Sequence, residues 1–515
     1  MSKHGVSVSM LLVAGLLIGG CNETPVGGVV DTLTITVADI TNTTGKIKLD
    51  IVWVIDNSVS MCQEQNSLAN NVDTFVEKFA ALNLDLRMAV ITTDVLTEAE
   101  QGNFHCKLPG QFPPNCIERE VHKCLKDEDC SGKFGPQWVC DEPTNGAINL
   151  TNLNGSINSK CRYLCDGNDQ CSDLYGDPDY KCTTPGNDAA ERGCILPPDI
   201  AGCPTDLPCV LTTEDGNIDL FRCVAIVGAE QAPNPQFEQG LNAALWALDT
   251  NPSPGVPDRS LQAKNFIRKD AYQVIIFITD EDDCSLATGV SLKKDDWNRC
   301  VCLKTTDDGG PLEPVSNFVN KLKSINADSS KVLVAAIVGD VSVGSQDSLG
   351  CPDDDQLDQC LKDKRELFQK SKCGPSAYAK NSYVCESVAG QAEWGSRYLE
   401  LVNRFGVNGV AANICNDAGF GPALDLISEK ILTRVVRVCL PRQVKPGTEL
   451  YVSKVLPNGE TTQLVQNAED GFTVETATDC PALGPDIGGK AVFLKKVLAA
   501  GEQLEVRYEA PIVAE

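Results

Sequence analysis

Histidine is scarce in this chain of 515 residues, which has only His4, His105 and His122. That scarcity argues against zinc sites built on histidine and against Ser/His/Asp catalytic triads. Basic residues are also few, with 44 Lys and Arg against 71 Asp and Glu, so the net charge is −27. We therefore expect no nucleic-acid partner, because phosphate backbones are bound by clustered cations. The hydrophobic and charged contents, 42% and 22%, are ordinary for a globular protein and exclude a wholly disordered chain.

Long hydrophobic runs are also absent, since no segment reaches 18 apolar residues. Residues 6–20 form an uncharged, mostly apolar run of an export signal, and the run ends at Cys21. The sequence Leu-Ile-Gly-Gly-Cys resembles the lipobox of bacterial lipoproteins. This resemblance implies that residues 1–21 are a lipoprotein signal peptide and that lipidated Cys21 anchors the chain to a membrane of the cell envelope. Asn22 favours the outer membrane, on either its periplasmic or its surface face; the alternative is a plain secretory signal.

Cysteine is abundant, with 25 copies, and none of them is spaced Cys-x-x-Cys. The absence of this spacing excludes thioredoxin-type redox centres and zinc ribbons. Disulfides formed in an oxidising compartment explain so many cysteines better than free thiols do. The total is odd, and assigning Cys21 to lipidation leaves an even number for pairing.

Apolar strands alternate with amphipathic helices over much of the chain. Strands are predicted at 49–56, 84–93, 273–279, 331–338 and 409–414, and helices near 68–82, 237–248, 315–325, 398–405 and 424–431. The alternation predicts an α/β fold with a doubly wound, mostly parallel sheet, which binds ligands at the carboxyl ends of its strands. We assign residues 22–46 to a tether and leading strand and 47–436 to the α/β domain. Residues 437–515 alternate with a shorter period and predict a small β domain, in which Cys439 and Cys480 are expected to pair.

The first predicted strand runs into Asp56-Asn57-Ser58-Val59-Ser60, and a later strand ends at Asp280. Carboxylates and hydroxyls brought together at strand ends supply the oxygen ligands that Mg²⁺ prefers. The Asp-x-Ser-x-Ser motif resembles the metal-ion-dependent adhesion site (MIDAS) of von Willebrand factor type A (VWA) domains, over roughly residues 47–436 less insertions. It is similar to VWA lipoproteins of Gram-negative bacteria. The resemblance implies a VWA-like fold, a Mg²⁺ ion (or Mn²⁺ or Ca²⁺) held by Asp56, Ser58, Ser60 and Asp280, and a position left for a partner's carboxylate.

An alternative interpretation is that Ser58 and Ser60 merely cap the following helix. The chain also departs from the family, which has a Thr in a loop before a later helix, whereas residues 228–240 contain none. Candidates for the missing ligand are Asn234, Gln236 and Glu238.

Further acids lie close to the predicted site in the sequence. Asp94 ends the neighbouring strand and is a candidate for an additional carboxylate near the ion. Asp282 and Asp283 follow Asp280, and we expect them to be solvated surface acids.

Disulfide-rich insertions interrupt the predicted domain. Residues 95–223 hold thirteen cysteines, and a Cys-x5-Cys spacing recurs at 124, 165 and 203. Little else there predicts a core, so we expect disulfides to hold the insertion, with its acids solvated rather than binding Ca²⁺. Two more insertions, 281–310 and 340–395, also follow predicted strands. We expect all three to build a wall around the ion, since loops at this edge carry function.

These observations favour a membrane-anchored, metal-dependent binding or adhesion protein, not an enzyme, whose partner is a protein or another carboxylate-bearing ligand. The alternative is a structural envelope lipoprotein with a degenerate metal site. A metal-dependent hydrolase would need a general base from Asp94, Glu238 or Glu281, and the sequence shows no two-metal cluster.

Overall fold

The computed structural model describes residues 30–37, 47–80, 84–107, 120–123, 131, 136–140, 160–165, 170–171, 181–183, 193–195, 203–228, 238–291, 300–340, 359–360, 363, 365–366, 383–387, 390–416, 419–435, 437–440, 442–468, 470–476, 480, 489–495 and 502–511. Among the residues of the predicted sites, Cys21, Asn234 and Gln236 lie outside the described residues.

A six-stranded sheet forms the centre of the protein, with the strand order β14-β11-β10-β2-β3-β9. The first five strands are parallel, and the short β9 is antiparallel to β3. The bounds are β2 (Lys48–Ile55), β3 (Asp85–Thr92), β9 (Leu211–Thr212), β10 (Tyr272–Ile278), β11 (Val332–Val338) and β14 (Gly409–Asn413). The predicted mixed α/β architecture with a mostly parallel sheet is therefore confirmed.

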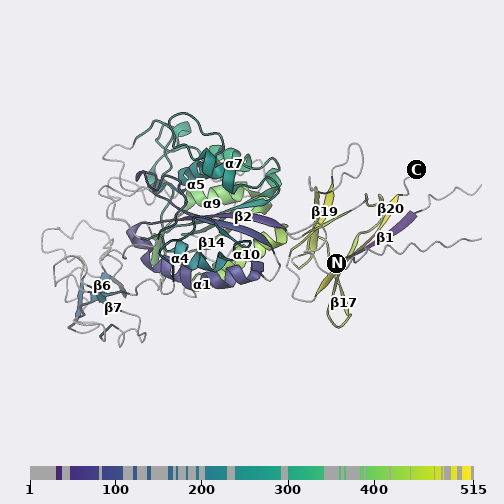
Figure 1. Ribbon diagram of the computed structural model, residues 1–515, viewed down its shortest axis with the longest axis horizontal. Helices are drawn as coiled ribbons and strands as arrows, with labels where there is room; N and C mark the ends of the chain where they lie inside the picture. Colours follow the sequence, from purple (N-terminus) through teal and green to yellow (C-terminus); the bar gives the residue numbers. More distant parts are fainter. Residues whose placement is uncertain are drawn as a thin grey trace, which may run out of the picture.

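Helices cover both faces of this sheet (Figure 1). One face is covered by α1 (Cys62–Ala80), α4 (Phe221–Ala225) and α10 (Gly421–Val435). The other is covered by α5 (Gly240–Leu248), α6 (Ser260–Phe266), α7 (Val315–Lys323) and α9 (Ser396–Arg404). Because β2 alternates between the two cores, Trp53 packs against Phe75 and Phe221 while Val52 and Val54 face the opposite layer. Burial on both sides explains the unbroken apolar run of the strand.

The end of the first insertion departs from the prediction. We expected residues 95–223 to depend on disulfides for lack of a core, but Leu211, Ile218 and Phe221 are buried in the main core beside α1. These apolar residues fall within a cysteine-rich stretch, and their burial depends on the distant surface of α1. The segment is also tied by disulfides, Cys106–Cys209 and Cys203–Cys223.

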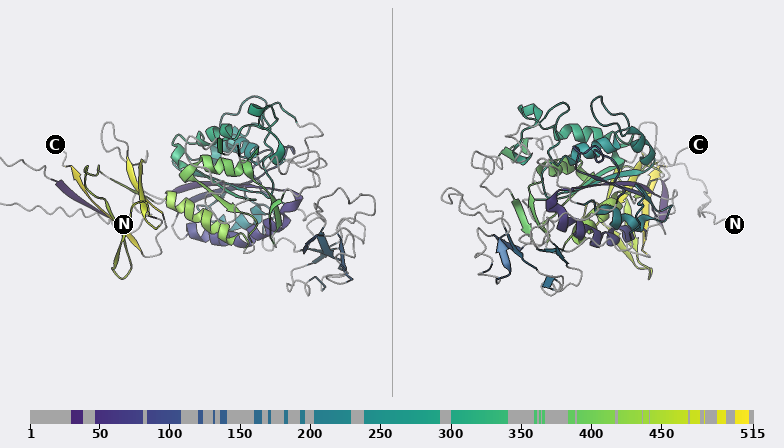
Figure 2. Two further views of the ribbon diagram at one scale, coloured as in Figure 1. Left: turned by 180° about the vertical axis from the view of Figure 1, so that it is seen from behind. Right: turned by 60° about the vertical axis from the view of Figure 1, so that its left-hand side comes forward.

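Short antiparallel strands occur in the described part of this insertion between residues 120 and 195. They are β4 (Glu120–Lys123), β5 (Trp138–Cys140), β6 (Lys160–Tyr163), β7 (Lys181–Thr183) and β8 (Gly193–Ile195), and Cys165–Cys182 is a disulfide among them. They lie at the opposite end of the α/β body from the C-terminal sheets (Figure 1, Figure 2). A further hairpin, β12 (Tyr383–Ser387) and β13 (Gly390–Glu393), leads into α9.

Residues after α10 form two antiparallel sheets. One contains β15 (Arg437–Cys439), β19 (Lys490–Leu494) and β18 (Phe472–Thr476), and the predicted Cys439–Cys480 disulfide is confirmed there. The other contains β16 (Tyr451–Val455), β17 (Thr461–Leu464), β20 (Gln503–Pro511) and β1 (Val30–Val37). The first strand of the chain thus pairs with the last, along its full length. Across the described segments, every helix is too short or too polar to span a bilayer.

Candidate metal-binding site

Two acidic residues stand side by side at the carboxyl edge of the central sheet. Asp56 follows β2 directly, and Asp280 comes two residues after β10. The strands are parallel neighbours with Ile278 opposite Ile55, and the Asp56 N–H donates to the Ile278 carbonyl at 3.0 Å. The two strands therefore deliver both acids to one point, as the sequence predicts.

The serines of the motif close on the same point. The Asp56 carboxylate accepts from the Ser58 N–H at 2.7 Å, which bends the chain sharply after the strand. This bend brings Ser58 Oγ within 2.9 Å of Ser60 Oγ, and Ser60 Oγ donates to Asp280 Oδ1 at 3.2 Å. Asp56, Ser58, Ser60 and Asp280 thus form one connected group of oxygens.

The spacing of these oxygens suits a small divalent cation. In a Mg²⁺ octahedron with bonds of about 2.1 Å, adjacent ligand oxygens lie about 3.0 Å apart and opposite ones about 4.2 Å apart. The 2.9 Å between Ser58 Oγ and Ser60 Oγ matches the adjacent spacing. Among the described residues, no three acidic side chains lie within 4.8 Å of one another, so at most two carboxylates would ligate one ion directly in this arrangement. The two hydroxyls and the two acids fit such an ion, with each acid acting directly or through water.

A cysteine cluster is the one group of three conventional ligands among the described residues, and it is not a metal site. Cys165, Cys171 and Cys182 lie within 4.8 Å of one another. All three are disulfide-bonded, Cys165 to Cys182. A thiolate is required for metal ligation, so these sulfurs serve as cross-links.

Glu238 lies close enough to Asp56 and Asp280 for their charges to act on it, and it contacts a threonine. Glu238 is 4% exposed, and its carboxylate accepts a hydrogen bond from Thr93 Oγ1 at the end of β3. Thr279 Oγ1 donates to Asp56 Oδ2 at 2.5 Å. We did not predict either threonine. The signal was a Thr immediately before an acid at two strand ends, Thr93-Asp94 and Thr279-Asp280.

Asp94 lies near the group but is engaged in its own turn. Its Oδ1 accepts from the Leu96 N–H at 2.7 Å and from the Thr97 N–H at 3.0 Å. Its charge nevertheless contributes to raising the pKa of Glu238, which places it within electrostatic range of the site. Asp94 is therefore a neighbouring charge whose side chain already stabilises a loop.

Burial is the main electrostatic cost at the site, and repulsion between its acids adds to it. Burial raises the pKa of Asp280 well above its usual value, and the Asp56 carboxylate raises it further. Burial and then Asp56 raise the pKa of Glu238 in the same way, and burial, Asp280 and Asp56 raise that of Glu281. No ion pair among the described side chains involves any of these four acids. A bound cation would offset this cost of burying like charges.

Asp282 and Asp283 are not the solvated acids that we expected, because both are fully buried. Asp282 accepts from Ser396 Oγ at 2.7 Å and from the Arg397 N–H at 2.9 Å, so it caps the start of α9. Asp283 accepts from the Leu241 N–H at 3.0 Å at the start of α5 and pairs with Arg397 Nε at 2.9 Å. These distant partners satisfy their charge, and the loop after Asp280 is fastened to two helices.

Gln65 braces the other side of the site from α1. Its side-chain amide donates to the Asp56 carbonyl at 2.9 Å and to the Gly228 carbonyl at 3.0 Å. It also accepts from the Gly228 N–H at 3.1 Å. A completely buried glutamine therefore fixes both the motif strand and the start of the segment that leads to Glu238.

Comparisons with known proteins add little to this geometry. No protein-family model matches the chain, and no curated protein matches it. Two crystal structures of the pilus adhesin SpaC from Lactobacillus rhamnosus GG, one of them in an open conformation, align with 95% of the chain at 10% identity and TM-scores of 0.29 and 0.31. The pilus adhesin RrgA from Streptococcus pneumoniae aligns with 93% of it at 12% identity and a TM-score of 0.20. The chain spans 42% and 41% of the SpaC chains and 58% of RrgA, and similarity this low carries no argument about function.

Proposed function

We propose that this protein is a VWA-like binding or adhesion protein of the cell envelope, anchored through lipidated Cys21. It holds a divalent cation, Mg²⁺ or else Mn²⁺ or Ca²⁺, through Asp56, Ser58, Ser60 and Asp280. The cation in turn engages a carboxylate on a partner protein or other ligand. Metal binding supplies a strong local positive charge that the side chains of this site lack.

The observation that carries the proposal is the joining of two hydroxyls and two buried acids at adjacent strand ends. Ser58 Oγ and Ser60 Oγ lie 2.9 Å apart, and Ser60 Oγ lies 3.2 Å from Asp280 Oδ1. Oxygen ligands of mixed charge, with acids that pair with no described cation, are the chemistry that a hard divalent ion selects. Ser60 is exposed, so the group opens to solvent on the side where a partner would approach.

Binding explains the site better than turnover does. Two of the three candidate general bases are already engaged, Glu238 by Thr93 and Asp94 by the amides of its own turn, which leaves Glu281. A hydrolase would need a base free to take a proton from water at the ion. We accordingly propose that the protein is not an enzyme.

Metal titration of the full-length chain in detergent tests the proposal. We expect one high-affinity site for Mg²⁺ or Mn²⁺ by calorimetry, and about a hundredfold loss of affinity in Asp280→Asn and in Asp56→Asn, because each removes a full charge beside the ion. Asp258→Asn is the matched control, since Asp258 is exposed and its carboxylate accepts from the Ser260 N–H instead of contacting the site residues. Equal metal affinity in wild type and in both site variants would refute the proposal.

A structural envelope lipoprotein with a degenerate site is the second candidate. It is favoured by the hydrogen bonds that Asp56 and Glu238 already make to Thr279 and Thr93, which hold these acids without an ion. Folded protein that binds no divalent cation at millimolar concentrations would shift the conclusion to this function.

A further inference from the structure

A pocket lies at the end of the α/β body where the C-terminal three-stranded sheet meets it. Its volume is about 230 Å³. The body contributes the ends of α7 and α10 and the loops 329–330 and 405–408, and the sheet contributes residues from β15, β18 and β19. The loops 329–330 and 405–408 precede β11 and β14, so the pocket lies at the amino edge of the central sheet, whereas the candidate metal site lies at the carboxyl edge. We refer to it as the seam pocket.

The lining of the seam pocket is positively charged. Among the described residues that line it, Lys323, Arg434 and Arg437 stand against one acid, Glu475, which gives these residues a net charge of +2. Glu475 is engaged by Arg434, whose guanidinium donates to both carboxylate oxygens at 3.0 Å and 2.9 Å. The chain as a whole has a net charge of −27, so a cluster of positive charges in one pocket is the opposite of what its composition predicts.

Aromatic rings and backbone carbonyls hold these cations in place. The Arg437 guanidinium lies 5.2 Å from the Tyr272 ring centroid and 5.7 Å from that of Phe493. Lys323 Nζ donates to the Arg404 carbonyl at 2.9 Å and lies 5.0 Å from the Phe405 ring centroid. The two charges are thus positioned before any ligand arrives, which lowers the entropic cost of binding.

The cations also carry an electrostatic cost. Burial lowers the pKa of Lys323, with Arg404 lowering it further, and burial lowers the pKa of Arg437 to about 10. Lys430, behind Arg434 on α10, has a pKa lowered by burial and then by Arg434. A negative ligand in the seam pocket would relieve this cost.

We propose that the seam pocket binds a small oxyanion of the phosphate class. A phosphate group carries a charge of about −1.5 to −2 near neutral pH, which balances the net +2 of the lining. Arginine and lysine donors are the groups that recognise phosphate oxygens. Asp328, whose carboxylate accepts from Ser330 N and Oγ, adjoins the pocket but is not among the residues that line it.

Bound phosphate would link the two parts of the protein. The donors come from the α/β body (Lys323 and Arg434) and from the C-terminal sheet (Arg437), so a ligand that contacts both stabilises their arrangement. The same chemistry is offered by free phosphate and by the headgroup of an anionic lipid, and the experiment must separate these sources.

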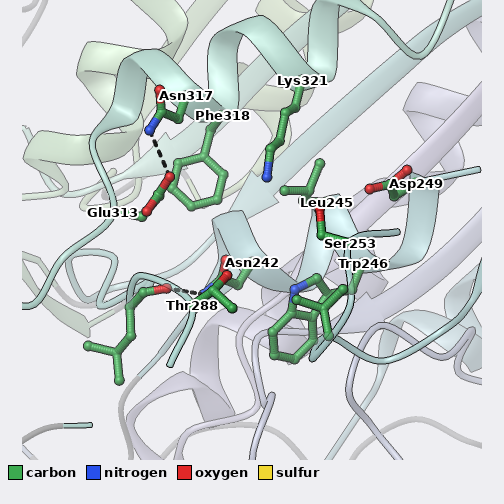
Figure 3. A pocket seen from close by; sticks show the side chains of 12 residues that line it. Asn242, Leu245, Trp246, Asp249, Ser253, Thr288, Glu313, Asn317, Phe318 and Lys321 are labelled. Carbon is green, nitrogen blue, oxygen red and sulfur yellow. Dashed lines mark hydrogen bonds between the residues drawn. The ribbon is translucent and has the colours of Figure 1, made fainter. Parts of the chain in front are cut away.

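Calorimetric titration of the full-length chain with inorganic phosphate, at constant ionic strength, tests the proposal. We expect binding, no comparable binding of acetate, and about tenfold weaker phosphate binding in Lys323→Gln, the loss typical of one charge-assisted contact. Lys321→Gln is the matched control, because Lys321 is on the same helix but points into a different cavity of about 40 Å³ beside α5 (Figure 3). Circular dichroism checks that each variant is folded.

Two further measurements complete the test. Glu475→Gln removes the only acid among the described lining residues, so it should tighten phosphate binding severalfold. Unchanged or weaker binding would count against the proposal. Binding to vesicles is compared between phosphatidylglycerol and phosphatidylcholine. If the protein binds phosphatidylglycerol vesicles, loses this binding in Lys323→Gln and does not bind free phosphate, the ligand is a lipid headgroup. Absence of Lys323-dependent binding to both phosphate and vesicles would overturn the proposal.

Discussion

Replacing Arg397 by methionine should destabilise the protein strongly, because this residue neutralises a buried acid. Arg397 and Asp283 are both fully inaccessible, with Nε 2.9 Å from Oδ2. A second guanidinium nitrogen donates to the Glu313 carbonyl at 2.7 Å. Removing one partner of such a pair leaves an uncompensated buried charge and costs about 3–5 kcal/mol. That is a large fraction of the roughly 5–15 kcal/mol by which a folded protein is stable.

The assay is urea denaturation followed by circular dichroism, with Arg404→Met as the matched control. Arg404 is on the same helix and pairs with Glu400 four residues earlier, with both side chains partly exposed. Loss of a helical surface pair of this kind costs only about 0.5 kcal/mol. A loss of less than about 1 kcal/mol in Arg397→Met would refute the reasoning.

A double mutant separates charge from packing. Asp283→Asn keeps an oxygen for the Leu241 N–H and the Ser285 hydroxyl but removes the charge. Combined with Arg397→Met, it should be less destabilising than the sum of the two single changes, by about 2 kcal/mol. Strict additivity would show that Arg397 stabilises α9 by packing alone.

Two further predictions concern the C-terminal sheets. Burial raises the pKa of Glu475, but hydrogen bonds from Arg434 and Thr473 outweigh burial and the net pKa lies below 4.5. The ion pair therefore stabilises the fold above that pH, and in a pH series of denaturation curves the stability difference between wild type and Glu475→Gln should shrink as the pH falls below 4.5. A difference that stays constant with pH would contradict this direction of the pKa shift. Replacing Cys439 and Cys480 together by serine opens a loop with a sequence separation of 41, which should lower the free energy of unfolding by about 4 kcal/mol according to the loop-entropy relation. Limited proteolysis should then cleave the C-terminal sheets faster. An unchanged cleavage rate would show that the disulfide is not needed there.

The parts of the fold that were predictable from the sequence are those governed by local periodicity. Every predicted strand of the central sheet is present, because strands buried on both faces, such as β2, β10 and β11, require unbroken apolar runs. The convergence of Asp56 and Asp280 was also predictable, since parallel strands place their carboxyl ends at one edge.

What the sequence could not reveal depends on partners far along the chain. Asp282 and Asp283 look like surface acids in the sequence because their cationic partners, Arg365 and Arg397, lie 83 and 114 residues away. β1 pairs with β20 at the far end of the chain, and no local pattern encodes this pairing. The contact of Thr93 with Glu238 likewise joins two loops across a separation of 145 residues.

The run from Asp280 to Asp283 shows how neighbouring acids acquire different functions. Asp280 faces the serines of the motif, whereas the next buried pair caps α9 and α5. Because the side chains of Asp282 and Asp283 are fastened to two helices, the backbone that carries Asp280 has little freedom to move. A rigid loop keeps Asp280 beside Asp56 despite their repulsion, which a flexible loop would relieve by letting them separate. If the proposed function is correct, the structural aspartates maintain the electrostatic cost that a cation offsets. Replacing Asp282 by asparagine should then reduce metal affinity, measured by calorimetry, without altering any oxygen of the proposed site.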